Sequence, residues 1–246
     1  NQLASGTIAA VDGDKIFING KSLGFQLPAE QNGKTIQAIG DAKLNTTTKK
    51  FGSASLQLDG VGDAAKVNTN ADFGFGTGDF TIDFWAYPNA VQTTSLIDMR
   101  NNVSVENALY FYVANNVPKV YVNGSDIITG SQGFNLSTWT HCEIVRSSGT
   151  ITVYINGSSV GSASASADFA NAKPLVIGNN FGNTNGWNGY IDALRVYKGQ
   201  ALHTGNFTAP TTEAVGNANT KLVANFNGNN ASTTFLDTNL IAQDIR

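Results

Sequence analysis

The feature that most constrains the fold is an alternation of apolar and polar residues that recurs in short segments separated by turn-forming residues. The segment 187–197 (WNGYIDALRVY) shows it most clearly, and segments 80–87, 108–113 and 150–157 repeat it. A period of two places successive side chains on opposite faces of a β-strand, so each segment is typical of a half-buried strand. The chain therefore predicts an all-β protein.

Ten strands are expected in the central part of the chain. They are 54–59, 64–68, 79–87, 94–99, 108–114, 117–122, 139–147, 150–156, 174–178 and 189–197. Turn-forming pairs such as Asn123-Gly124 and Asn156-Gly157 separate several of them, and Ser147-Ser148-Gly149 predicts a hairpin between two others. With hardly any helical pattern, the expected fold is a two-sheet antiparallel sandwich.

Three sections are expected along the chain. Residues 1–40 form an N-terminal arm or small ββα-type appendage, with a hairpin around Asp12-Gly13-Asp14 and a short helix over 32–39. Residues 41–212 form the sandwich. Residues 213–246 form a linker and a C-terminal strand, 220–226, which either completes its own sandwich or pairs with a neighbouring chain.

Composition excludes several classes of function. Charged residues make up 13% of the chain and the net charge is −3, without the clustered cations that nucleic acid requires, so we expect no nucleic-acid partner. No apolar run approaches the ~18 residues of a membrane-spanning helix, so no membrane insertion is expected. Cys142 is the only cysteine and is expected to be a buried small hydrophobe. The chain begins at Asn1, so we expect it to be processed or cut from a longer chain.

Motifs in a fixed order between residues 50 and 210 carry a family resemblance. They are KFGSASLQLDG (50–60), DFGFGTGDFTIDFW (72–85), WTH (139–141) with VR (145–146), VYING (153–157), NGYIDALRVYKG (188–199) and NFTAP (206–210). In these motifs the chain resembles the laminin-G-like, concanavalin A-like jelly rolls, especially the copies in bacteriophage virion proteins. The resemblance covers about residues 43–212 and implies a jelly-roll sandwich.

The C-terminal section resembles the opening strand of the same family, although it follows the sandwich. The matching residues are 221–228, followed by 232–237. Three explanations stay open: a circularly rearranged domain, a tandem array in which this strand starts the next copy, or a strand donated between subunits.

Catalytic chemistry finds little support in the residues. Glycoside hydrolysis needs two carboxyl groups beside the scissile bond, and none of the four glutamates lies in the Glu-x-Asp-x-x-Glu pattern of the laminarinase-like relatives. Asp79 and Asp83 share a face of an expected strand, which alone is weak support for a catalytic pair. His141 and His203 are the only histidines, too few for a zinc site. We expect no enzyme.

Calcium is the one ion that the resemblance implies. Many relatives hold a structural Ca²⁺ between the opening strand and the Ile-Asp of the closing strand, and Asp192 and Asn227 match those positions. Asn227 replaces the usual aspartate, which lowers the ligand charge and the expected affinity. The alternative is that Asp192 only hydrogen-bonds a loop.

Glycan binding is expected in the loop 179–188, where flat rings and amides occur together. Its candidate residues are Phe181, Asn183, Trp187 and Asn188. The alternative is that Trp187 folds inward and packs the end of the sandwich. Trp85 and Trp139 lie on alternating strands and are expected in the core.

The sequence thus predicts a non-catalytic structural and adhesion module of a virion or cell-surface assembly, located on the virion surface or extracellularly. Its expected partners are other copies of itself, other assembly proteins and surface glycans. The alternative function is a pure assembly or decoration subunit that exchanges strands between copies. A carbohydrate-active enzyme ranks last.

Overall fold

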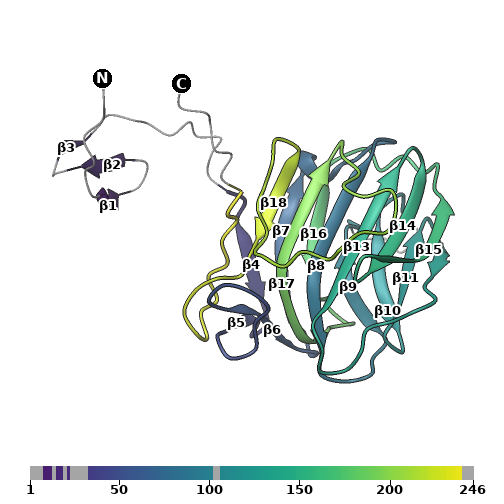
Figure 1. The fold of residues 1–246 in the computed structure, drawn as a ribbon, viewed down its shortest axis with the longest axis horizontal. Helices are drawn as coiled ribbons and strands as arrows, with labels where there is room; N and C mark the ends of the chain where they lie inside the picture. Colours follow the sequence, from purple (N-terminus) through teal and green to yellow (C-terminus); the bar gives the residue numbers. More distant parts are fainter. Residues whose placement is uncertain (1–7, 13–14, 19–20, 23–32, 102–105, 240–246) are drawn as a thin grey trace. The chain divides into compact units, whose positions relative to one another are not determined.

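The computed structural model describes residues 8–12, 15–18, 21–22, 33–101 and 106–239. The chain divides into two units, Asn1–Gly33 and Lys34–Arg246. In the first unit, β1 (Ile8–Asp12), β2 (Lys15–Ile18) and β3 (Lys21–Ser22) form a three-stranded antiparallel sheet (Figure 1). The hairpin predicted around residues 12–14 is confirmed by the β1–β2 pairing, although residues 13–14 lie outside the described part.

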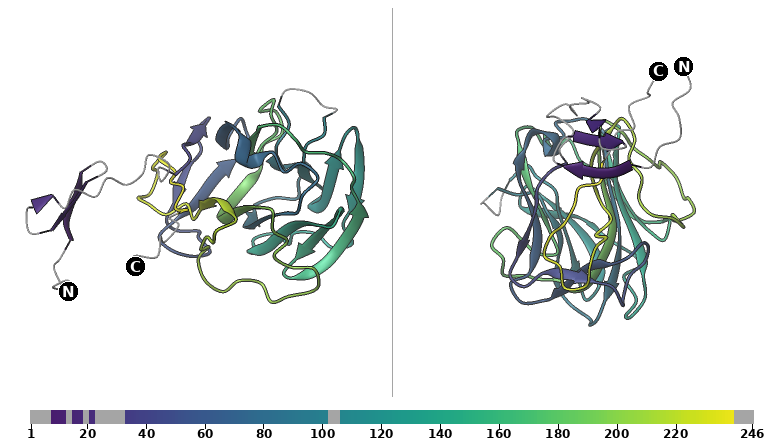
Figure 2. Two further views of the ribbon diagram at one scale, coloured as in Figure 1. Left: turned by 90° about the horizontal axis from the view of Figure 1, so that it is seen from above. Right: turned by 90° about the vertical axis from the view of Figure 1, so that its left-hand side faces the viewer.

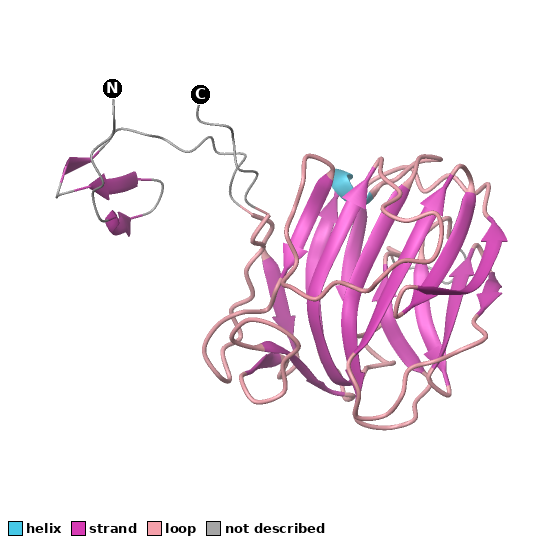
Figure 3. Cartoon of the chain, viewed as in Figure 1, coloured by secondary structure: helices cyan, strands magenta, loops and turns pink. Residues whose placement is uncertain are grey.

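The second unit is a sandwich of two antiparallel sheets, which Figure 2 shows as two facing layers. The seven-stranded sheet contains, in spatial order, β12 (Ser125–Thr129), β11 (Val117–Val122), β10 (Tyr110–Ala114), β9 (Thr94–Asp98), β16 (Lys173–Ile177), β7 (Ala64–Asn70) and β4 (Ile36–Ile39). A short 3₁₀ turn, η2 (Ala71–Phe73), follows β7 and is drawn in cyan in Figure 3.

The eight-stranded sheet lies opposite. It contains, in spatial order, β15 (Ser158–Ser164), β14 (Thr150–Ile155), β13 (Thr140–Ser147), β8 (Phe80–Pro88), β17 (Asn188–Lys198), β6 (Ser55–Asp59) and β5 (Lys43–Asn45), and β18 (Thr220–Ala224) also pairs with β17. The predicted two-sheet antiparallel sandwich is therefore confirmed, and each of the ten strands expected in its central part is present.

The predicted helix over 32–39 is wrong, because Ile36–Ile39 is strand β4. Ile36 is buried and lies opposite Val67 of β7, while Gln37 is exposed, so the residues alternate with a period of two. β4 thus belongs to the seven-stranded sheet of the sandwich. The edge strands β12 and β15 were not predicted, because their residues are mostly polar and exposed.

Asn-Gly pairs form the hairpin turns that the sequence indicated. Asn123 and Gly124 have φ of 46° and 91°, and Asn156 and Gly157 have φ of 48° and 80°. Two consecutive positive φ values are the mark of a type I′ turn, whose twist matches that of the paired strands. These turns fix the β11–β12 and β14–β15 registers.

The core fills the space between the two sheets. Its largest fully buried side chains include Phe80 and Phe84 of β8, Phe111 of β10 and Leu56 of β6. Cys142 is fully buried among them as predicted, and burial raises the pKa of its thiol. A second, smaller apolar cluster lies outside the eight-stranded sheet and contains Trp85, Ala193, Ala214 and Val223, with the partly buried Trp139 packed against it.

The C-terminal segment completes the sandwich within its own chain. β18 pairs with β17 along Leu194–Tyr197, and Leu222, Phe226 and Phe235 are buried in the main core. Phe235 also forms an isolated bridge with Ile36 of β4. This segment therefore connects β17, late in the sequence of the sandwich unit, with β4, its first strand.

The segment 199–219, here called the strap, connects β17 to β18 across the outer face of the eight-stranded sheet (Figure 1). The Gln200 carbonyl accepts a hydrogen bond from Thr81 Oγ1, and Phe207 N–H donates to the Gly157 carbonyl. The strap thus covers side chains of β8, β13 and β14. Among the described residues, no helix is long and apolar enough to cross a membrane.

Candidate functional site

The outer face of the seven-stranded sheet carries a patch of four aromatic side chains and one arginine, here called the tyrosine face: Tyr110, Tyr112, Tyr121, Phe181 and Arg100. Tyr110 and Tyr112 alternate on β10, so their rings lie on one side, stacked 5.0 Å apart and 9° from parallel. Tyr121 of β11 lies opposite Tyr110, with ring centroids 6.0 Å apart. Tyr112 and Tyr121 are half-buried, so their rings are partly open to solvent.

Charged groups fix the orientation of these rings. The Tyr112 hydroxyl donates to Asp126, which also accepts from Lys119 Nζ at 2.8 Å. Burial and the Asp126 carboxylate raise the pKa of the Tyr112 hydroxyl, so the phenol stays protonated. The face therefore offers rigid rings bordered by an ion pair.

Arg100 connects the tyrosines to the predicted glycan loop. Its guanidinium carbon lies 3.8 Å from the Tyr110 ring centroid and 4.8 Å from that of Phe181. Two of its nitrogens donate to the buried Asp98 carboxylate, at 2.9 and 2.7 Å. Burial alone would lower the pKa of Arg100, but the charge and hydrogen bonds of Asp98 raise it. The arginine therefore contacts both the Tyr110 and the Phe181 ring.

Two of the four predicted glycan residues line one hollow beside this face. Phe181 and Asn183 are joined there by Asn180, Lys66 and Val176, around a small pocket of about 80 Å³. The loop is held in shape by Asn side chains, because Asn183 Nδ2 donates to the Gly62 carbonyl at 2.6 Å. The pocket and the tyrosine face share Phe181, so together they form one continuous surface.

The other two predicted glycan residues lie elsewhere. Trp187 is fully buried and packs edge-on against Phe134, so the prediction that its ring is exposed for sugar stacking is wrong. The alternation of the strand that follows turns this ring toward the core, which is the alternative considered from the sequence. Asn188 bonds to Gln92 and Asn89 near the end of β8, where it fixes loop geometry.

An acidic cluster that no sequence motif indicated lies beneath the same loop. Asp41, Asp59 and Asp63 each place a carboxylate oxygen within 4.8 Å of the others, an arrangement that could hold a metal ion. The buried Asp63 accepts hydrogen bonds from the Asp41 and Asp59 N–H groups, and burial raises its pKa. Asn179 Nδ2 donates to both the Asp63 carbonyl and Asn183 Oδ1, which connects the cluster to the loop.

Asp192 and Asn227, the pair predicted to hold calcium, both bind the loop 50–53. Asp192 Oδ2 accepts from the N–H groups of Lys50 and Phe51 at 2.9 and 3.1 Å. Asn227 Oδ1 accepts from Ser53 N–H at 2.6 Å. Asp192 therefore hydrogen-bonds a loop, as the alternative required, and calcium at this pair stays a prediction.

A cluster of ionisable groups lies buried beneath the strap. Asp83 of β8 accepts a hydrogen bond from Arg195 Nε at 3.0 Å and contacts His141 Nε2 at 3.3 Å. Glu143 lies opposite Asp83 on β13, and its carboxyl oxygens lie 2.9 and 3.0 Å from His203 Nδ1. Asp83 and Glu143 are 1% and 0% exposed, so a carbohydrate cannot reach this acidic pair.

The protonation states within this cluster follow from burial. Burial and the neighbouring Asp83 charge raise the pKa of Glu143 to about 9. Burial lowers the pKa of His203, whose Nδ1 lies within hydrogen-bond distance of the Glu143 carboxyl group. Asp83 differs: burial opposes its ionisation, but His141 and Arg195 hold its pKa below the usual value.

The raised pKa of Glu143 should make the free energy of unfolding decrease as the pH rises toward about 9. Its pKa is raised in the folded state, so its contribution to stability is complete below the unfolded pKa of about 4.5 and is lost as pH rises toward about 9. We expect the melting temperature of the native protein to fall between pH 7.5 and 9 relative to that of Glu143→Gln, which cannot ionise. If the melting temperatures of the two proteins change equally with pH over this range, the raised pKa of Glu143 is contradicted.

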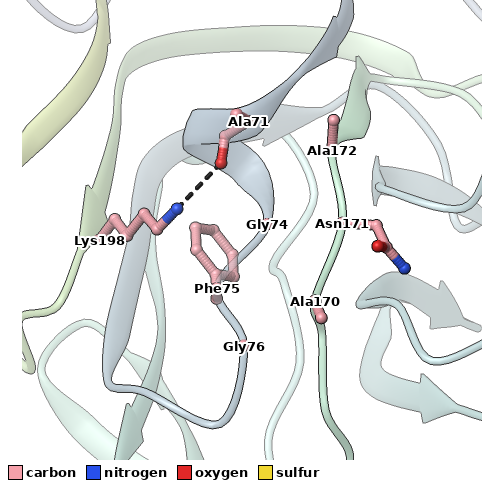
Figure 4. Close-up of a pocket in the computed structure, with 8 residues that line it drawn as sticks. All are labelled: Ala71, Gly74, Phe75, Gly76, Ala170, Asn171, Ala172 and Lys198. Carbon is pink, nitrogen blue, oxygen red and sulfur yellow. Dashed lines mark hydrogen bonds between the residues drawn. The ribbon is translucent and has the colours of Figure 1, made fainter.

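A larger pocket, here called the end pocket and drawn in Figure 4, lies where β7 and β17 end and β16 begins. Its volume is about 430 Å³, and it is lined by Ala71, Gly74, Phe75, Gly76, Ala170, Asn171, Ala172 and Lys198. Residues 71–76 form one wall and residues 170–172 the other. Lys198 Nζ reaches across to donate to the Ala71 carbonyl at 2.9 Å.

The fold is a two-sheet β-sandwich with aromatic side chains on one outer face. Residues 59–205, more than half of the chain, match the Laminin_G_3 family, described as the concanavalin A-like lectin/glucanases superfamily. The chain therefore belongs to this family, which confirms the predicted resemblance to concanavalin A-like domains, while the resemblance to bacteriophage virion copies stays a prediction. No curated protein sequence matches the chain.

Solved structures share the fold at low sequence identity. A structure of botulinum neurotoxin type C is 13% identical with a TM-score of 0.52, and the match covers 78% of this chain and 47% of the toxin chain. A Trypanosoma rangeli sialidase mutant is 13% identical with a TM-score of 0.53, and the match covers 68% of this chain and 28% of the sialidase chain. These similarities establish the sandwich fold alone.

Proposed function

We propose that the protein is a non-catalytic carbohydrate-binding module and that the tyrosine face, with its adjoining pocket, is the binding surface. The observation that carries this proposal is the row of partly open rings next to amide and lysine side chains on one sheet face. Rigid aromatic rings pack against the C–H faces of sugars, while amides and charged groups bond to their hydroxyls.

The shape of the face favours an extended glycan over a single sugar. The partly open rings of Tyr112, Tyr121 and Phe181 are spread over β10, β11 and the loop after β16, and each contacts the buried side chain of Tyr110 or Arg100. Successive aromatic groups along a sheet can each hold one sugar unit of a chain. Asn180 and Asn183 at the end of this row supply hydrogen-bonding groups.

The comparisons are in keeping with this proposal. The family is described as containing lectins as well as glucanases. Botulinum neurotoxin type C depends on interaction with two ganglioside molecules to enter cells. The sialidase is an enzyme, but in this chain the buried acidic pair Asp83 and Glu143 is covered by the strap, which favours binding over hydrolysis.

We further propose that the module belongs to a virion or cell-surface assembly and acts extracellularly, with other copies or assembly proteins as partners. The neutral, amide-rich surface and the motif resemblance support this placement. The alternative, a decoration subunit that exchanges strands between copies, is less favoured because β18 pairs with β17 of the same chain.

A structural calcium ion stays part of the proposal. Calcium takes hard oxygen ligands, and carboxylates are the strongest of these. The Asp41, Asp59 and Asp63 cluster offers such oxygens beneath the proposed binding loop. Binding assays run with calcium and with a chelator would show whether an ion is needed to hold that loop.

The test is a glycan array probed with the native protein and with Tyr112→Ala. Truncating a stacked ring should weaken binding of the best glycan at least tenfold, which is about 1.4 kcal/mol. Tyr190→Ala is the matched control, because Tyr190 is also partly exposed but lies on the opposite sheet. Native protein that binds no glycan, or equal binding losses in both variants, would reject the assignment.

A further inference from the structure

We propose that the end pocket is a second binding site, which takes the carboxylated ring of an acidic sugar such as a uronic acid. The pocket is formed by residues outside the tyrosine face, so this inference does not depend on the function proposed for that face. Its volume of about 430 Å³ falls within the range of about 300–1,000 Å³ typical of small-molecule sites.

The two walls of the pocket are held in place before any ligand arrives. Arg146 is buried, and its Nη1 donates to the carbonyls of Gly76 and Ala167, one from each wall region, at 3.1 and 3.0 Å. Phe169 N–H also donates to the Gly76 carbonyl at 2.9 Å. A preformed site loses less free energy in ordering its groups on binding.

Glycine at position 74 permits the close approach of the walls. A Cβ built on Gly74 would lie 2.1 Å from the Asn171 carbonyl oxygen, closer than any side chain allows. With Gly76 and the alanines at 71, 170 and 172, this leaves main-chain surface uncovered in the pocket. Sugar hydroxyls can therefore reach backbone groups that larger side chains would cover.

The charged side chains in and around the end pocket favour a ligand of negative charge. Lys198 is the one charged residue among the eight that line the pocket in the described part of the chain. Its ammonium donates one hydrogen bond to the Ala71 carbonyl, which leaves two N–H groups to donate. Two carboxylates border the walls, and each has a cationic neighbour: Asp72 is paired with Lys34 at 2.7 Å, and the charge of Asp168, whose Oδ1 accepts from Ala170 N–H at 2.9 Å, acts on the buried Arg146 guanidinium. An anion is thus favoured over a neutral ligand.

The apolar side chains that line the end pocket can pack against the ring of the proposed ligand. Phe75 lies beside Lys198 in Figure 4, and the methyl groups of Ala170 and Ala172 belong to the opposite wall. A pyranose ring has apolar C–H faces that can pack on such a lining while its hydroxyls point to the exposed main chain. A carboxylate on the same ring would then meet the Lys198 ammonium.

The test measures binding of glucuronate and galacturonate by ligand-observed NMR and calorimetry, with glucose and acetate as comparison ligands. We expect millimolar binding of at least one uronate, at least tenfold weaker binding of glucose, and weaker binding of acetate. No uronate binding, or equal binding of glucose or acetate, would overturn the proposal.

Two variants locate the site. Lys198→Gln keeps a donor for the Ala71 carbonyl but removes the charge, and Ala170→Leu fills the pocket. Each should weaken uronate binding at least tenfold. Lys49→Gln is the matched control, because Lys49 Nζ also donates to a main-chain carbonyl, that of Thr46, outside the pocket.

The binding data for these variants distinguish uronate binding at the end pocket from glycan binding at the tyrosine face. Tyr112→Ala should leave uronate binding by the end pocket unchanged. Unchanged binding in Ala170→Leu, or losses in Lys49→Gln equal to those in Lys198→Gln, would overturn the site. If melting curves show that Lys198→Gln does not fold, the Ala170→Leu result decides.

Discussion

Removal of residues 220–246 should abolish cooperative folding of the sandwich. These residues supply β18 and the core side chains Leu222, Phe226 and Phe235. Each large core side chain that is lost costs about 2–5 kcal/mol, and whole domains are stable by only about 5–15 kcal/mol. The truncated chain should show no cooperative thermal transition in circular dichroism, whereas the full chain melts in one step.

Polar contacts add to this loss. Asp237 accepts hydrogen bonds from the N–H groups of Val223 and Lys34, and the Ser232 carbonyl accepts one from Leu44 N–H. Deleting the segment leaves β4 and β5 without these partners and exposes an unpaired edge of β17. The damage therefore reaches strands that are distant in sequence.

A peptide of residues 219–239 provides the control for this prediction. Added to the truncated chain, it should restore cooperative melting, because it carries the whole missing strand and the Phe235 contact. Deletion of residues 1–33, a separate unit, should leave the melting temperature nearly unchanged. A truncated chain that melts like the full chain would show that β18 is dispensable.

Arg195→Ala should be the most damaging single substitution of a charged residue beneath the strap. Asp83 is 1% exposed, and Arg195 is its main cationic partner. Removing one member of a buried ion pair leaves an uncompensated charge and costs about 3–5 kcal/mol. For a chain of this size the melting temperature should fall by about 10 °C.

An exposed pair and a double variant complete this experiment. Lys119→Ala breaks the more exposed pair with Asp126 and should cost less than about 1 kcal/mol. Replacing Asp83 and Arg195 together by leucine should recover much of the lost stability, because neither charge is then left alone. A drop for Arg195→Ala no larger than that for Lys119→Ala would contradict the role of the pair.

The fold was largely predictable because period-two alternation and Asn-Gly turns are local signals. β8 and β17 alternate clearly, and type I′ turns follow directly from Asn123-Gly124 and Asn156-Gly157. Ile36–Ile39 was predicted as helix because its partner strand β7 is distant in sequence, and only that pairing identifies β4. Short segments take their structure from such partners.

The candidate site was only partly predictable. Composition of the loop pointed to Phe181 and Asn183, but whether Trp187 faces solvent depends on the register of β17 against β8 and β6, which the sequence does not encode locally. Tyr110, Tyr112 and Tyr121 were visible as strand residues, yet their gathering on one face required the pairing of β10 with β11. The end pocket joins segments about a hundred residues apart.

The bonding of Lys34 to Asp237 and Lys221 has an architectural consequence. The first and last described residues of this sandwich unit therefore lie close together. Such a unit can be inserted into a surface loop of a host protein without forcing apart the chain on either side. The same geometry lets many copies be strung along one polypeptide, each presenting its rings and pockets at a distance from the connecting strand.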